Sequence, residues 1–211
     1  MSISRRKFIQ QTALLTAGSS IMSKSLFAQP AANPLVGIQL YSVRADMMAN
    51  AAGTLKALSD MGFKYVEHAN YVNRKFYGYT PKDFKKLLSD LGMEMRSGHT
   101  VMGKDHWDNS KKDFSDSWKY TVEDAATVGQ EYVISPWLDN SMRKTEDDFK
   151  RYMDVFNACG KLCKQWNMKF GYHNHDFEFT EKMGNVTLYE AILANTDPEL
   201  VIQQLDTGNM H

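Results

Sequence analysis

The chain has 211 residues, with 25 Lys and Arg balanced by 25 Asp and Glu, two Cys, 43% apolar residues and 12% aromatic residues. This composition is typical of an ordinary globular protein and excludes the disordered, collagen-like and disulfide-scaffold classes. No apolar run reaches the about 18 residues that predict a membrane-spanning helix, and the balanced charge gives no reason to expect nucleic acid as a partner.

The N-terminal segment has the pattern of a targeting signal. The pair Arg5 and Arg6 precedes a mildly apolar stretch over residues 12–22, and an imperfect small-residue cleavage site follows it. Twin-arginine export signals have this form. We therefore expect residues 1–28 to be an export signal that directs the protein to the periplasm or beyond, and residues 29–211 to be the folded domain. An amphipathic N-terminal helix that stays attached is the alternative.

Short apolar stretches that end in polar residues then alternate with amphipathic stretches, which predicts a repeated strand and helix pattern. Six strands are predicted: Val36 to Val43, Tyr65 to Ala69, Met93 to Thr100, Tyr132 to Trp137, Lys169 to His175, and Val201 to Asp206.

Helix signals lie between these strands. A first helix is predicted through Leu55, Leu58 and Met61. A second begins at Thr80 with Pro at the first helical position, and its apolar stripe is Phe84, Leu87, Leu88 and Leu91. A third runs through Trp118 and Val122 to Gly129. A fourth begins at Thr145, and it carries Cys159 and Cys163, which we expect to be buried thiols.

Alternating strands and helices predict a parallel sheet, either open or closed into a barrel. An open, nucleotide-binding sheet would be favoured by a Gly-rich turn after the first strand, and none follows it. Successive strands start about 33 residues apart, so eight units would reach about residue 300, which is within the size of a (β/α)₈ TIM barrel. We predict an α/β TIM barrel, of which about six βα units are present.

The working groups of such a barrel lie at the carboxyl ends of its strands. Residues suited to chemistry or binding are found at five of the predicted strand ends: Glu67 and His68, His99, Trp137 with Asp139 just beyond, His173 to Asp176, and Asp206. A cluster of imidazole and carboxylate groups at one rim indicates a metal site or acid and base machinery. For Asp206, capping of a following helix is the alternative.

The fifth strand is the most informative. Alternation places His173 and His175 on one face, about 6.6 Å apart along the chain, and turns Asn174 away. Both imidazoles could therefore reach one bound object. The carboxylates Asp176 and Glu178 follow them.

The segments GYHNHDFEF and QLDTGNM, together with YVE on the second strand and SGHT at the end of the third, resemble the sugar phosphate isomerase/epimerase family, which has a xylose-isomerase-like TIM barrel. The resemblance covers about residues 35–211. It implies a divalent metal ion, most often Mn²⁺ with Mg²⁺, Co²⁺ or Zn²⁺ as alternatives, bound by a Glu, an Asp, a His and a second Glu on strands five to eight.

By this resemblance, Asp206 matches the family's Asp on strand six. His173 stands where many relatives have the first Glu, so either His173 is the ligand or Glu178 folds back to supply the carboxylate; we favour His173. The His and second Glu expected on strands seven and eight would lie beyond His211, which indicates a chain truncated at its C-terminus.

The function implied is an exported, metal-dependent enzyme that moves a proton next to the carbonyl of a small sugar substrate. We expect Glu178 and His175 to be catalytic, and we expect the sugar to be bound by Glu67, His99, Trp137 and Asn174. Two other readings remain open: a keto-sugar lyase or hydrolase on the same barrel, and a non-catalytic sugar- or metal-binding protein. DNA cleavage of the endonuclease IV kind is disfavoured because removal of the leader leaves four more acidic than basic side chains.

Overall fold

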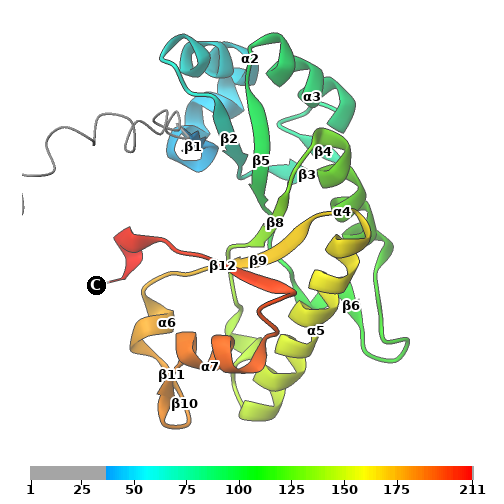
Figure 1. The fold of residues 1–211 in the computed structure, drawn as a ribbon, viewed down its shortest axis with the longest axis vertical. Helices are drawn as coiled ribbons and strands as arrows, with labels where there is room; N and C mark the ends of the chain where they lie inside the picture. Colours follow the sequence, from blue (N-terminus) through cyan, green and yellow to red (C-terminus); the bar gives the residue numbers. More distant parts are fainter. Residues whose placement is uncertain (1–36, 211) are drawn as a thin grey trace, which may run out of the picture. The chain divides into compact units, whose positions relative to one another are not determined.

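The computed structural model describes residues 37–210 (Figure 1). The predicted export signal at residues 1–28 and the predicted start of the first strand at Val36 lie outside the described residues. None of the helices within residues 37–210 has the length and apolar character needed to cross a membrane.

Six parallel strands form one sheet. They are β1 (Gly37–Gln39), β2 (Tyr65–His68), β5 (Glu94–His99), β8 (Tyr132–Ser135), β9 (Lys169–His173) and β12 (Val201–Gln204). Their order in the sheet is their order along the chain, and each neighbouring pair is parallel. This arrangement confirms the predicted parallel α/β fold and the positions of all six predicted strands.

Every strand ends earlier than the sequence predicted: β2 and β5 by one residue, β8, β9 and β12 by two, and β1 by four. β1 ends at Gln39, and the following residues form a short 3-10 helix, η1 (Leu40–Val43). β9 ends at His173 rather than His175, and β12 ends at Gln204 rather than Asp206. The apolar pattern misled the prediction at β1 because Leu40 is buried beneath the first helix, where it packs without belonging to a strand.

Helices follow the strands: α2 (Arg44–Asp60), α3 (Pro81–Asp90), α4 (Asp116–Val128), α5 (Glu146–Gln165), α6 (Phe177–Thr180) and α7 (Leu188–Asn195). The predicted starts of α3 and α5 are confirmed, because Thr80 and Thr145 each accept a hydrogen bond from the backbone three residues on. The first predicted helix was expected to include Met61, which instead follows the end of α2 and is 73% exposed.

Three two-stranded hairpins extend the loops that follow β2, β5 and β9. They are β3 (Tyr71–Val72) with β4 (Lys75–Phe76), β6 (Trp107–Asp108) with β7 (Asp113–Phe114), and β10 (Lys182–Met183) with β11 (Val186–Thr187). Further single turns of 3-10 helix are η2 (Lys104–His106), η3 (Asn140–Met142) and η4 (Thr207–Asn209). The carboxyl ends of the strands are therefore surrounded by structured loops.

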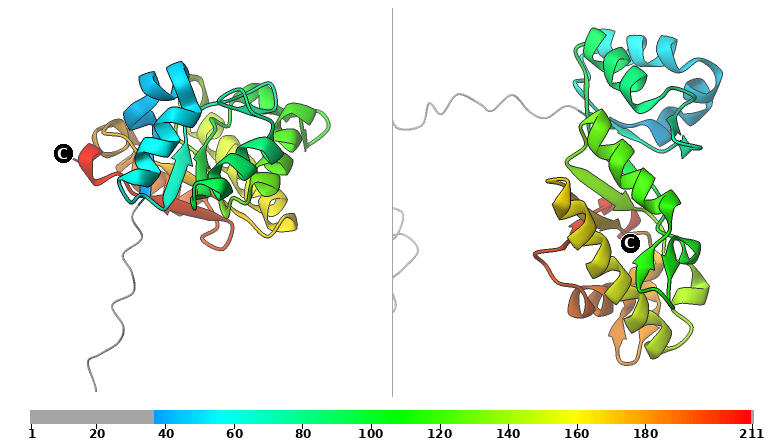
Figure 2. Two further views of the ribbon diagram at one scale, coloured as in Figure 1. Left: turned by 90° about the horizontal axis from the view of Figure 1, so that it is seen from above. Right: turned by 90° about the vertical axis from the view of Figure 1, so that its right-hand side faces the viewer.

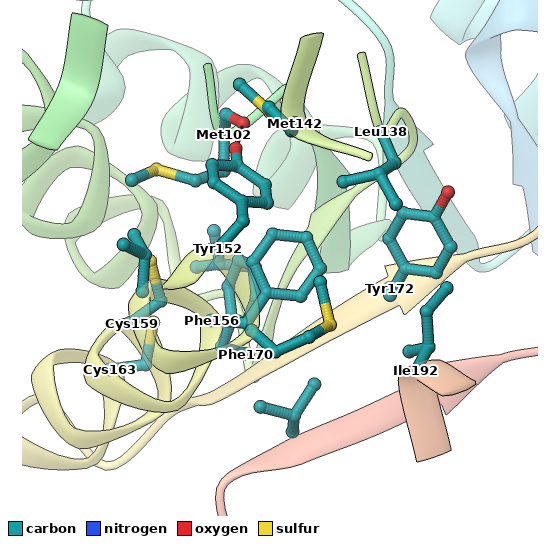
Figure 3. Close-up of a cluster of buried hydrophobic side chains, with 14 of the residues drawn as sticks. Met102, Leu138, Met142, Tyr152, Phe156, Cys159, Cys163, Phe170, Tyr172 and Ile192 are labelled. Carbon is teal, nitrogen blue, oxygen red and sulfur yellow. Dashed lines mark hydrogen bonds between the residues drawn. The ribbon is translucent and has the colours of Figure 1, made fainter. Parts of the chain in front are cut away.

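The helices between the strands pack on one face of the sheet (Figure 1 and Figure 2). Two apolar clusters fill the space between them and the sheet, one around α2 and α3 and one around α4, α5 and α7. Cys159 and Cys163 lie in the second cluster beside Phe156 and Phe170 (Figure 3). Both are free and fully buried, which confirms the prediction of buried thiols.

The other face of the sheet is polar near the carboxyl ends of the strands. Gln39, Glu67 and Ser97 are paired across β1, β2 and β5, and His173 is paired with Gln204 across β9 and β12. Paired residues project from the same face of a sheet. The curved sheet therefore brings five polar side chains from five strands onto one surface.

Candidate active site

A cavity with a volume of about 580 Å³ lies at the carboxyl ends of the strands. Five of the residues that the sequence predicted for the site line it: His99, Trp137, His173, His175 and Asp206. Gln39 and Tyr41, from the end of β1, complete the polar and aromatic wall. Three predicted residues, Glu67, Asn174 and Glu178, are not among the lining residues and lie behind them.

His173 and Asp206 form a pair on the cavity wall. His173 Nε2 lies 3.5 Å from Asp206 Oδ2. Asp206 also accepts hydrogen bonds from the backbone N–H of Gly208 at 2.8 Å and from Asn209 Nδ2 at 2.9 Å. The alternative reading of Asp206 as a helix cap is thus correct, because it caps η4. Capping fixes the carboxylate, and the same carboxylate still faces the cavity.

Asn174 holds Asp206 in place. Its Nδ2 donates to the backbone carbonyl of Asp206 at 3.1 Å, and its Oδ1 accepts from the backbone N–H of Asp206 at 2.9 Å. The side chain is 1% exposed. Since both ends of the amide are used by one residue of a neighbouring loop, Asn174 fixes the end of β12 relative to the end of β9.

Glu67 accepts hydrogen bonds from several side chains beneath the cavity. The donors are Gln39 Nε2 at 2.8 Å, Ser97 Oγ at 2.5 Å and Gln204 Nε2 at 2.6 Å. His99 Nε2 also lies 3.0 Å from Glu67 Oε1. Both oxygens of the Glu67 carboxylate are thus engaged by side chains beneath the cavity.

Two opposing effects set the charge of Glu67. Burial disfavours the ionised form, but the hydrogen bond and charge of His99, with the hydrogen bonds of Ser97 and Gln39, favour it more strongly and lower the Glu67 pKa to about 2. Glu67 is therefore a fixed negative charge at neutral pH.

Glu178 is fully buried and lies behind His175. Its carboxylate accepts a hydrogen bond from the Tyr172 hydroxyl and another, of 2.7 Å, from the backbone N–H of His175. Its Oε1 is 3.9 Å from His175 Nδ1, a ring nitrogen that is buried and has no hydrogen-bond partner within residues 37–210. Glu178 thus holds the loop that carries His175, and its carboxylate does not reach the cavity.

Aromatic side chains form one wall of the cavity. Trp137 is 42% exposed and meets the rings of His175 and Phe177 edge-on, with centroids 5.3 Å away in both contacts. The indole is thus held by ring contacts and stays partly exposed where it lines the cavity. Such a surface suits the apolar face of a sugar ring.

The sequence profile of the xylose isomerase-like TIM barrel family matches residues 55–211. The chain belongs to this family. Two crystal structures of sugar phosphate isomerase/epimerases from Parabacteroides distasonis are similar to it, at 27% and 29% identity with TM-scores of 0.70 and 0.67. They cover 82% and 81% of this chain, which spans 65% and 68% of theirs. A search of curated proteins returned no match.

The same fold is found in a D-psicose 3-epimerase crystallised in the presence of D-fructose. That structure is 17% identical, with a TM-score of 0.59, and the match covers 82% of this chain and 64% of the epimerase. The comparisons establish a sugar isomerase/epimerase-like TIM barrel, as the strand-end motifs indicated.

The metal site implied for this family can be tested against the donor atoms that are present. His173 and Asp206 both face the cavity and are close enough for one ion to contact the two of them. Within residues 37–210, however, no group of three or more His, Cys, Asp and Glu is placed to hold a metal. The described residues supply two donors of such a site and do not complete it. Of the two candidates on the fifth strand, His173 faces the cavity and Glu178 does not.

Three residues of the site were not predicted from the sequence: Gln39, Ser97 and Gln204. Their side chains join Glu67, His99 and His173 into one hydrogen-bonded network. A signal for two of them was present, because Ser97 and Gln204 each stand two residues before a predicted site residue. Alternation places such residues on the same face of the strand.

Proposed function

We propose that the complete protein is an exported, divalent-metal-dependent sugar isomerase or epimerase that moves a proton next to a sugar carbonyl. The observation that carries the proposal is the cavity in which three imidazoles, one carboxylate and an accessible indole converge at the carboxyl ends of the strands. The sugar phosphate isomerase/epimerases to which the chain is similar support the reaction class.

Two side chains would position the sugar. Trp137 offers its face to the apolar side of the ring, and Asp206 accepts hydrogen bonds from ring hydroxyls. The carboxylate is held by Gly208 and Asn209, so it accepts these bonds without the entropy cost of ordering a free side chain.

His175 is proposed to move the proton. Its ring is fixed by parallel stacking on Phe177 and by edge contacts with Trp137 and His173. Because Nδ1 is buried toward Glu178, proton exchange with the sugar falls to Nε2.

A divalent ion, Mn²⁺ in the first instance, would be held by His173 and Asp206 with further donors. When bound, such an ion polarises the sugar carbonyl and the neighbouring hydroxyl. The positioning by Trp137 and the proton transfer by His175 are derived from this chain's own residues and do not depend on it.

The experiment incubates the purified full chain with Mn²⁺ and a panel of aldoses and ketoses in D₂O. Proton transfer next to a carbonyl exchanges a carbon-bound hydrogen for deuterium, which NMR and mass spectrometry detect. We expect exchange in the wild type, its loss in His175→Gln, and its retention in His106→Gln, which changes a histidine outside the cavity.

Other outcomes of that experiment separate the alternatives. Loss of water or cleavage of a keto-sugar would indicate a lyase or hydrolase, and sugar binding with no exchange anywhere in the panel would indicate a non-catalytic binding protein. Export is tested separately by fusing residues 1–28 to a reporter that is active only after folded translocation; replacement of Arg5 and Arg6 by Lys should abolish its signal.

A further inference from the structure

We propose that Gln204 is a positioning residue that fixes ring protons on opposite nitrogens of two histidines: Nδ1 of His173, which leaves Nε2 for the cavity, and Nε2 of His99. The structural part of this inference stands on the hydrogen-bond network alone. Its consequence for chemistry rests on the proposed function.

The contact with Glu67 fixes the amide orientation of Gln204. Its Nε2 lies 2.6 Å from Glu67 Oε2. An ionised carboxylate only accepts hydrogen bonds, so the atom that faces it must be the amide nitrogen. The fixed charge of Glu67 therefore determines that Gln204 Oε1 points away, toward the two histidines.

Gln204 Oε1 in turn determines which ring nitrogens carry protons. It lies 2.9 Å from His173 Nδ1 and 2.7 Å from His99 Nε2. An amide oxygen donates no hydrogen bond, so each of these nitrogens must be the donor. His173 is then protonated at Nδ1 and His99 at Nε2.

A second acceptor supports the proton on His99 Nε2. That nitrogen also lies 3.0 Å from Glu67 Oε1, and a carboxylate oxygen only accepts. Gln39 Nε2 lies 3.2 Å from both ring nitrogens of His99 and does not distinguish them.

The other ring nitrogen of His173 faces the cavity. His173 Nε2 lies 3.5 Å from Asp206 Oδ2, and both residues line the cavity wall. Because Gln204 holds a proton on Nδ1, His173 meets a ligand in the cavity through Nε2.

The experiment records long-range proton–nitrogen NMR spectra of the metal-free full chain labelled with ¹⁵N-histidine, with His173→Gln and His99→Gln used to assign the signals. A ring nitrogen that carries a proton differs strongly in ¹⁵N shift from one that does not, so the spectrum reads the tautomer directly. We expect Nδ1–H for His173 and Nε2–H for His99. The same tautomer in both residues would overturn the inference.

The role of Gln204 is tested with Gln204→Met, which keeps the side-chain length and removes the amide. The Nδ1–H preference of His173 should be lost, and retention of it would refute a positioning role for Gln204. Gln203→Met is the matched control, because Gln203 lies on the opposite face of β12, and both tautomers should be unchanged. If Gln204→Met does not fold, the wild-type spectrum still decides the inference.

The same spectra separate this inference from the proposed function. Absence of sugar turnover with opposite tautomers in the wild-type spectrum would refute the proposed function and leave the tautomer assignment standing.

Discussion

Replacing Glu178 by alanine should destabilise the fold far more than a surface substitution does. The side chain is fully buried, and its two carboxylate oxygens receive hydrogen bonds from the Tyr172 hydroxyl and the His175 backbone N–H. The substitution leaves both donors buried without an acceptor, and each such loss from a charged partner costs about 1.5–3 kcal/mol. Relief of the buried charge offsets part of this, so we expect a net loss of about 3–5 kcal/mol in the free energy of unfolding.

For a domain of this size, such a loss lowers the melting temperature by about 10 °C. Urea unfolding followed by circular dichroism measures it. Glu178→Gln keeps the shape and one acceptor, so it should cost about 1–2 kcal/mol. Glu199→Ala, at an exposed glutamate whose side chain makes no hydrogen bond to another residue of the range 37–210, should change stability by less than about 0.5 kcal/mol.

The result that would refute this reasoning is a Glu178→Ala protein as stable as the wild type. If that protein also lost its catalysis of deuterium exchange, Glu178 would be a catalytic group that reaches the cavity in a conformation different from this one.

Three further changes test other parts of the structure. Trp137→Ala should weaken sugar binding by about 10-fold, as measured by calorimetry, because a stacking face worth about 1 kcal/mol or more is lost, while Trp166→Ala should not. Gly160→Ala should cost about 1–3 kcal/mol in urea unfolding, since the added Cβ would lie 2.3 Å from the Leu200 carbonyl oxygen; a neutral result would mean that α5 can move. Burial lowers the pKa of His68 to about 3. The unfolded chain therefore binds more protons than the folded protein below pH 6.5. The free energy of unfolding should fall as the pH drops from 6.5 toward 3, by about 2 kcal/mol at pH 5. His68→Leu should remove that part of the acid sensitivity, and an unchanged stability profile would contradict it.

Much of the architecture could be predicted from the sequence because it depends on local patterns. Apolar periodicity located six strands. Thr80 and Thr145 predicted the starts of two helices, because a threonine at the N-cap accepts a hydrogen bond from the backbone of the first turn. Alternation along β9 and β12, combined with the rule that parallel strands share a carboxyl edge, brought His173 and Asp206 to the same rim. These inferences need no knowledge of distant contacts.

The tertiary structure decided which residues of the site face the cavity and which hold other side chains in place. Glu67 and Gln204 are separated by 137 positions and still form a 2.6 Å hydrogen bond, because the curvature of the sheet brings β2 and β12 together across its inner face. Sequence periodicity gives the face of a strand but not the curvature of a sheet, so Glu67 was predicted to bind the sugar although three side chains engage its carboxylate and it does not line the cavity.

Asn174 and Glu178 show the same limit in a loop. Strand alternation ends at His173, and the directions of the next side chains are set by hydrogen bonds to particular backbone groups: those of Asp206 for Asn174 and that of His175 for Glu178. The sequence by itself determined which polar residues gather at the rim of the barrel. Only the packed structure decided which of them face the cavity and which hold the others in place, because that choice depends on the burial of each donor and acceptor.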